Sequence, residues 1–495
     1  MNRNILYRQI LFLIFLIFLI PPVVSAHVSG RGLILLLPTN LFIAGGAAVV
    51  AASFALLTLV PIKRIVSLSN HRGKVIVLKW SWAGKWVSVA SLAFFSFLIL
   101  TGFYGARDPL RNPAPLFIWS FWWPGMTFAS TILGDVWSFL NPWTGICELI
   151  AESRVFRRKT IRPPLKYPEK LGYIPAIIAL MLFAWVELVY PSPTDPEILS
   201  TLAVVYLVYI FAGIALFGKV AWLEHCEAFT VFFKMVSWIS PISVSEPYSH
   251  RDVAAVSDGG VFSGRRASKV VISLPTANLT RKRRLSLSHT LFILLALSTV
   301  SFDGFSRTFT WLSFIGVNPL DYPGRTLLVP MNSLSLLGAF LAMAIAYALA
   351  NTLAKLLVFR THSLSAIMGM FIPSIIPIAL GYHIAHYFPF FLNDIQMVYA
   401  SFSDPFGLGW NLLGVSGPPA IPSFLKDPYQ VYYLYYVQVG LIVLVHVLAV
   451  YVSHVIALRE VNSVRKAMIS QVPMTLLMVA YTIFGLWLLS SPSID

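Results

Sequence analysis

The chain has 495 residues, of which 57% are hydrophobic and 11% are charged, and its mean hydropathy is +0.77. Soluble domains carry about 25% charged residues, and no soluble fold has enough interior to bury so much apolar surface. The composition therefore excludes an ordinary soluble enzyme, and two cysteines exclude a disulfide-stapled secreted domain. It predicts an integral membrane protein whose first partner is the lipid bilayer.

Residues 1–26 have the three parts of a secretory signal peptide: a positive start, a short apolar run over Ile10–Ile20, and small residues before a cleavage site at Ala26. Cleavage there would leave His27 as the first residue, whose α-amino group and imidazole together could chelate a metal ion. We therefore expect residues 27–495 to form a single transmembrane helical domain with its N-terminus outside the cell.

Apolar stretches of about 20 residues recur along the remaining chain, the length that a helix needs to cross a bilayer. They predict an all-α, polytopic transmembrane helix bundle in the plasma membrane, with about ten spans. The predicted spans are 40–61, 84–104, 116–138, 172–190, 198–218, 289–306, 331–357, 364–389, 431–457 and 470–490.

The net charge of +16 is informative about orientation. Lysines and arginines gather in the segments 62–79, 139–171 and 241–288, and again after residue 457. With the N-terminus outside, all four segments fall on the cytoplasmic face, which agrees with the positive-inside rule. The positive charge is thus explained by topology, and we expect no nucleic-acid partner.

Two segments on the predicted cytoplasmic side differ from the spans: residues 219–240 and 241–288. Residues 241–288 are rich in Ser, Gly and Arg and are typical of a flexible basic loop. Residues 219–240 are apolar but contain Glu224, His225 and Glu227, and counting them as a span would place the basic loop outside. We expect an interfacial or re-entrant helix there.

Ionisable residues inside the spans are costly, so they mark candidate functional positions. Glu187, Asp303, His383 and His386 all fall near the outer ends of their spans. The two histidines are three residues apart and share one helix face. Imidazoles and carboxylates together suit a divalent transition metal such as Zn or Cu. The sequence therefore predicts an exoplasmic metal site with His27, His383 and His386 as ligands, and Glu187 and Asp303 as catalytic residues.

Other roles for these residues are open. The two histidines could instead pair with backbone groups or carboxylates in the bundle, or serve a proton path, and the two carboxylates could bond helix ends. Gln438, near the outer end of its span, and His446, near mid-depth, are candidates for orienting the metal ligands or relaying protons.

Several stretches resemble a family of bacterial and archaeal multi-pass membrane proteins labelled fenitrothion hydrolase. The resemblance implies hydrolysis of an organophosphate triester by a membrane-bound protein, and Glu187, Asp303, His386 and Gln438 lie within the similar stretches, whereas His383 lies just outside. The stretches are 37–54, 112–115, 133–143, 183–190, 301–306, 385–388, 403–406, 436–439 and 485–489.

Three functions follow as hypotheses. The first is a metal-dependent phosphotriester hydrolase that takes a small-molecule substrate from the exoplasmic side. The second is a permease, or a protein that handles metal ions or protons, in which the intramembrane histidines mark a polar path. The third is an accessory subunit that associates with a membrane protein partner.

Overall fold

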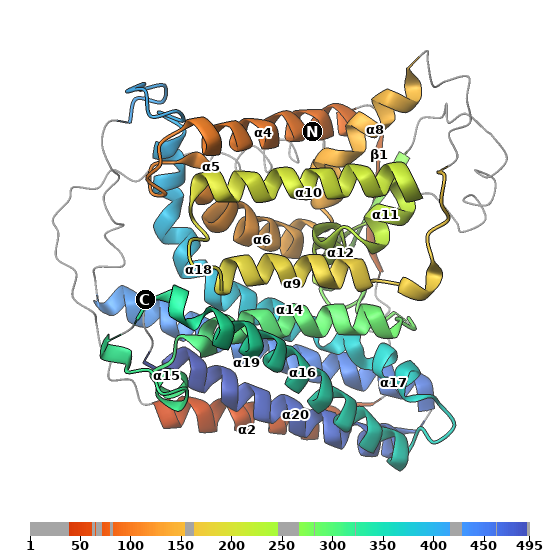
Figure 1. The fold of residues 1–495 in the computed structure, drawn as a ribbon. Helices are drawn as coiled ribbons and strands as arrows, with labels where there is room; N and C mark the ends of the chain where they lie inside the picture. Colours follow the sequence, from red (N-terminus) through yellow and green to blue (C-terminus); the bar gives the residue numbers. More distant parts are fainter. Residues whose placement is uncertain are drawn as a thin grey trace, which may run out of the picture.

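The computed structural model of the chain is a bundle of helices that run roughly side by side (Figure 1). The predicted signal peptide and His27 lie outside the described residues. The structure describes residues 39–61, 65, 72–79, 83–153, 163–245, 267–281, 283–321, 323–415, 428–461 and 463–492.

Within this part of the chain, seven helices are long and apolar enough to cross a membrane, and a bent pair makes an eighth candidate. The bent pair joins α17 (Leu364–Phe371) and η5 (Ile372–Ser374) to α18 (Ile376–Ser401) with a bend of 45°. The seven helices are α2 (Thr39–Leu59), α4 (Ala83–Tyr104), α10 (Pro196–Phe217), α14 (Leu287–Ser306), α16 (Arg325–Leu357), α19 (Pro428–Val461) and α20 (Val464–Ser490).

The other two predicted spans are also helical but less regular. The span 116–138 falls on a continuous run made of α5 (Pro113–Pro115), the π-helical η1 (Leu116–Trp122) and α6 (Trp123–Leu133). The span 172–190 falls on the 15-residue helix α9 (Ile174–Leu188). Every predicted span thus coincides with a helix, and the prediction of an all-α polytopic bundle is confirmed.

The segment 219–240 forms two short helices, α11 (Lys219–His225) and α12 (Ala228–Val236), followed by η3 (Ser237–Ile239). Helix α12 does not lie on the surface of the bundle. It packs against α6 and α9, and its Phe233 is fully buried. This burial favours the re-entrant alternative over the interfacial one.

Helices α11 and α12 are separate, and Glu227 caps the N-terminus of α12. Its carboxylate accepts hydrogen bonds from the backbone N–H groups of Phe229 at 3.0 Å and Thr230 at 2.6 Å. These donors have no partner inside the helix, so a capping side chain satisfies them. Glu227 also accepts a hydrogen bond from the Tyr206 hydroxyl. The carboxylate is therefore buried with its oxygens satisfied.

The segment 241–288 is not loop throughout, contrary to the expectation of a flexible loop. Its described ends contain β2 (Ile242–Ser245) and β3 (Ala267–Ser273), which pair antiparallel with each other. Strand β3 also pairs with β1 (Arg72–Lys79), giving the order β1-β3-β2. Two of the predicted basic segments are thus joined by one small sheet.

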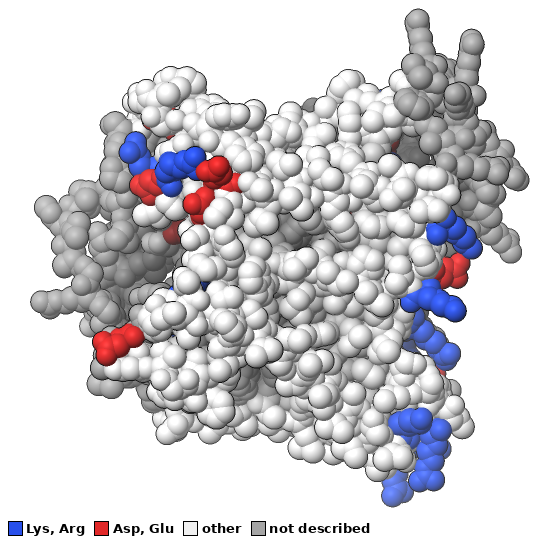
Figure 2. All heavy atoms as spheres, in the orientation of Figure 1, with Lys and Arg blue, Asp and Glu red and all other residues white. Residues whose placement is uncertain are grey.

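Charged residues are unevenly distributed over the surface of the described structure. Lys and Arg gather at one end of the helices, at the right of Figure 2, and the surface between the two ends is almost free of charge on this face. Such an apolar belt between charged ends is expected of a membrane-spanning bundle. The remaining short elements of the described structure are α7 (Trp137–Leu140), α8 (Pro142–Glu152), η2 (Glu169–Leu171), α15 (Phe309–Phe314) and η4 (Pro319–Asp321).

Candidate functional site

An ion-paired cluster lies where α14 ends, at the end of the bundle opposite the main gathering of Lys and Arg. His386 Nε2 lies 2.6 Å from Asp303 Oδ2, and Arg307 Nη2 lies 3.1 Å from Asp303 Oδ1. Only 4% of the Asp303 side chain is exposed, against 22% for His386 and 31% for Arg307. A buried carboxylate is thus held between two partly exposed cationic or ionisable groups.

Local helix geometry explains this arrangement. Asp303 and Arg307 are four residues apart at the C-terminal end of α14, so their side chains meet on one helix face. A cation is also favourable at this helix end. Helix α18 carries His386 and packs closely on α19 at Gly381, where an added Cβ would collide with the side chain of Val445. Glycine therefore allows the approach that sets the position of α18.

Glu187 belongs to a neighbouring network. The Tyr387 hydroxyl donates a hydrogen bond of 2.7 Å to Glu187 Oε1, and Arg325 Nη1 donates one of 2.8 Å to the Glu187 backbone oxygen. The Tyr387 ring contacts the His386 ring at a centroid distance of 4.8 Å, so the Asp303 and Glu187 networks lie side by side. The structure thus brings together three of the predicted site residues: Glu187, Asp303 and His386.

His383 faces a different environment. Its ring packs against Trp123 and Tyr387, with centroid distances of 4.9 and 4.5 Å, and it is 4% exposed. With Glu187 it lines an internal cavity of about 10 Å³, and its Nε2 has no hydrogen-bond partner within the described part of the chain. A polar cavity of this size is just large enough for about one water molecule. His383 therefore points into a small closed space and does not join the Asp303–His386 pair.

The metal prediction has limited support from these positions. No group of three His, Cys, Asp or Glu side chains is placed to hold a metal ion among the residues that the structure describes. Both carboxylate oxygens of Asp303 are already in ion pairs, and His383 lines a separate cavity. The remaining predicted ligand, His27, lies outside the described part of the chain, so the Zn or Cu site stays a prediction.

Gln438 contacts the helix that carries His386, whereas His446 bonds within its own helix. Gln438 Nε2 donates a hydrogen bond of 2.7 Å to the backbone oxygen of Ala385, next to His386. His446 is fully buried, and its Nδ1 lies 2.7 Å from the backbone oxygen of Ile442. Gln438 therefore links α19 to α18 next to His386, whereas His446 lies deeper and touches none of the Asp303 cluster; the predicted orienting and relay roles stay predictions.

Sequence reasoning missed three members of the cluster: Arg307, Arg325 and Tyr387. The spacing of Asp303 and Arg307, four residues apart near a helix end, is a signal that could have identified the first. Tyr387 and Arg325 join the cluster through contacts with Glu187 that link helices far apart in the sequence. Nothing in the local sequence points to those contacts.

Comparison of the chain with protein-family models, with curated proteins and with solved structures gave no match. The resemblance described above therefore stays an expectation.

Proposed function

We propose that this integral membrane protein hydrolyses neutral phosphotriesters at the Asp303–His386 pair. The observation that carries the proposal is the 2.6 Å contact between a buried carboxylate and an imidazole that stays partly exposed. An imidazole held by a carboxylate through one nitrogen can use the other nitrogen as a general base. The resemblance supports the substrate class and a location in the plasma membrane.

The proton positions follow from the contact. Because Nε2 of His386 faces a carboxylate oxygen, it carries the hydrogen and donates it to Asp303. In the neutral imidazole, Nδ1 then has the lone pair. Nδ1 would take a proton from water as the water oxygen bonds to phosphorus. The bond from phosphorus to the leaving alkoxide or aryloxide then breaks, which leaves a phosphodiester.

Two guanidinium groups make the site favourable for this reaction. Arg307 contacts Asp303, and Arg325 contacts the backbone of Glu187. Negative charge grows on the phosphoryl oxygens in the transition state, and cations fixed beside the reacting phosphorus would stabilise it. Glu187 would have a supporting role through Tyr387, which lies beside the His386 ring at a centroid distance of 4.8 Å.

A metal ion is a separate part of the proposal. The described donor set does not fit a complete site, because His386 is the single imidazole of the cluster. A divalent ion such as Zn or Cu would need further ligands, of which His27 is the predicted one. No step above passes through a metal, and elemental analysis of the purified protein with and without His27→Ala decides whether one is bound.

Hydrolysis of diethyl p-nitrophenyl phosphate by the protein in liposomes tests the proposal. Replacing Asp303 by Asn should lower the rate on the order of 100-fold or more, because the imidazole loses its orienting partner. Glu197→Gln is the control, since it removes an exposed partner of Arg107 at the same end of the bundle. Equal rates for wild type and Asp303→Asn would contradict the proposal.

A second function, proton handling, is favoured by polar groups at increasing depth. Below the Asp303 cluster, the Ser301 and Tyr481 hydroxyls are hydrogen-bonded, and the Tyr382 hydroxyl donates a bond of 2.8 Å to the Tyr481 backbone. His446 lies beside both tyrosine rings, with centroid distances of 6.1 and 6.2 Å. Farther towards the basic end, His454 contacts Gln471 at 3.2 Å.

Proton flux into liposomes with an internal pH-sensitive dye tests this second function. His446→Ala should abolish flux if these groups form the path, whereas His362→Ala, at the basic end, should leave it unchanged. Hydrolysis without flux would exclude proton transport and leave the first proposal standing.

A further inference from the structure

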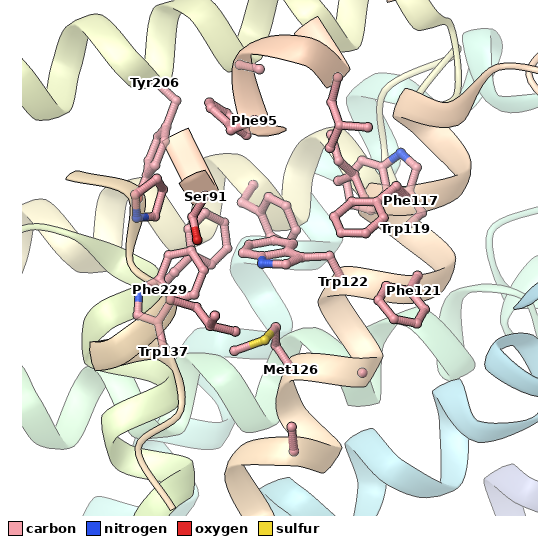
Figure 3. Close-up of a pocket in the computed structure, with 18 of the residues that line it drawn as sticks. Ser91, Phe95, Phe117, Trp119, Phe121, Trp122, Met126, Trp137, Tyr206 and Phe229 are labelled. Atoms are coloured by element: carbon pink, nitrogen blue, oxygen red, sulfur yellow. The ribbon is translucent and has the colours of Figure 1, made fainter. Parts of the chain in front are cut away.

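A large apolar cavity lies between α4, η1, α6, α9, α10 and α18, with Phe229 of α12 also on its wall. Its volume is about 1560 Å³, well above the roughly 300–1,000 Å³ of ordinary small-molecule pockets. Aromatic side chains dominate the wall shown in Figure 3, among them Phe95, Phe117, Phe121 and Trp137. Among the residues that the structure describes, none that lines it is charged. A ligand in this cavity must therefore be neutral and largely apolar.

The polar atoms of the wall are mostly occupied by the protein itself. Ser91 Oγ donates to the Val87 backbone at 3.0 Å, and Trp119 Nε1 donates to the Pro193 backbone at 2.9 Å. The hydroxyls of Tyr206 and Tyr209 bond to Glu227 and to the Cys226 backbone, and Trp137 Nε1 lies 3.2 Å from Thr230 Oγ1. These groups can donate a hydrogen bond to a ligand only by giving up one that they already make.

Trp122 is different. Its indole extends across the middle of the cavity (Figure 3), where it packs against Phe229 at a centroid distance of 4.7 Å and Trp137 at 5.6 Å. No described residue accepts a hydrogen bond from its Nε1. Trp143 also lines the cavity, and its Nε1 has no partner among the described residues, but that nitrogen is buried inside the wall and the side chain is only 2% exposed. Trp122 thus supplies a single N–H donor in an otherwise apolar space.

The cavity lies within the apolar belt, so its ligand can come from the membrane. Helix α10 packs mainly on α4 and α9 mainly on α14, which leaves the space between α9 and α10. Large apolar side chains from both helices, Leu182 and Val205, line the cavity and remain 58% and 60% exposed. A lipophilic molecule dissolved in the bilayer can therefore enter sideways without crossing water.

We propose that this cavity binds a neutral lipophilic molecule that carries one hydrogen-bond acceptor, such as a ketone or ester oxygen, with Trp122 Nε1 as the donor. The site is distinct from the Asp303–His386 pair, because Phe183 and Trp123 pack together at 5.0 Å between the cavity and the Glu187 network. The proposal does not depend on the hydrolytic function.

Photolabelling of the protein in liposomes with benzophenone tests the proposal, because benzophenone is lipophilic, uncharged and has one carbonyl acceptor. Label should concentrate on cavity residues such as Met126, as located by peptide mass spectrometry. Trp122→Phe keeps an aromatic ring but removes the N–H, and should reduce cavity labelling about three- to tenfold, as expected for the loss of one hydrogen bond. Labelling by an aryl trifluoromethyl diazirine, which has no carbonyl, should not change.

A second pair of variants tests the cavity itself. Ala203→Trp, on α10, fills the space and should abolish cavity labelling, whereas Ala342→Trp adds the same bulk to the exposed face of α16 and should not. Label that is spread over lipid-facing residues and is unaffected by Ala203→Trp would show annular lipid contact only and overturn the proposal. Equal loss of both probes in Trp122→Phe, or no loss of either, would overturn the role of the indole donor.

Discussion

Two regions of the bundle differ in how their helices are packed. In the most apolar stretch of α14, 72% of the residues are buried inside the protein, whereas 22% are buried in that of α10. Around α14 the interior contains ion pairs and hydrogen bonds, including the contacts of Asp303 and Glu187. Beside α10 the interior contains an aromatic cavity with one unused donor. Close packing holds reactive groups in place in the first region, and loose packing leaves room for a lipophilic molecule in the second.

The physical reason for the difference lies in the lipid environment. Apolar side chains gain little by packing together instead of facing lipid, so polar and ionic contacts and close fit hold membrane helices together. The α14 region has a buried ion pair, whereas the polar contacts of α10 are hydrogen bonds such as those of Tyr206 and Tyr209. The following variants are expected to affect the two regions unequally.

The largest loss of stability is expected for Asp303→Ala. Removing one partner of a buried ion pair costs about 3–5 kcal/mol, because the remaining charge is left uncompensated. We expect a value near the lower end, since Arg307 is 31% exposed. Thermal unfolding in detergent measures the effect. Glu197→Gln, in an exposed ion pair, should cost about 0–1 kcal/mol; an equal loss for both variants would contradict the distinction.

Leu295→Ala should also destabilise the packed region strongly. Leu295 on α14 is fully buried, and truncation of a core leucine costs about 2–5 kcal/mol through the space it leaves. Leu182→Ala is the matched variant on the cavity wall, where the side chain is 58% exposed and should be nearly neutral. Similar unfolding temperatures for the two variants would show that the regions are packed alike.

Glu227→Ala should have an intermediate effect centred on α12. The variant removes a helix cap and leaves buried donors unpaired, which costs about 1–3 kcal/mol. Faster amide hydrogen exchange in α12 should accompany the loss. Glu224→Ala, whose partner Lys234 lies 3.9 Å away in an exposed pair, should change neither stability nor exchange; unchanged exchange in Glu227→Ala would contradict the capping role.

The smallest effect is expected for Tyr387→Phe, which removes one hydrogen bond to Glu187. Net stability should fall by about 1 kcal/mol, the usual contribution of a single hydrogen bond. Phosphotriester cleavage should slow only modestly, because Asp303 and His386 remain paired. A loss of activity as large as that of Asp303→Asn would move the reactive centre to Glu187.

Hydropathy predicted the helices well because the length of an apolar run is set by bilayer thickness: each predicted span falls on helical structure, and seven or eight of these helices are long and apolar enough to cross a membrane in the described part of the chain. The shared depth of Glu187, Asp303 and His386 was enough to group them. Periodicity predicted one face for His383 and His386, but the rings of Trp123 and Tyr387 draw His383 into a separate cavity. Such contacts between distant helices, like the pairing of β1 with β3, are not encoded in local sequence patterns.

The most direct test of the reactive pair compares two histidines in one assay. His386 and His362 are both partly exposed and both contact a carboxylate, Asp303 for the first and Glu460 for the second. Release of p-nitrophenolate from diethyl p-nitrophenyl phosphate by the protein in liposomes should fall on the order of 100-fold or more in His386→Ala. It should stay at the wild-type rate in His362→Ala. A wild-type rate in His386→Ala would contradict the assignment of the Asp303–His386 pair as the reactive centre.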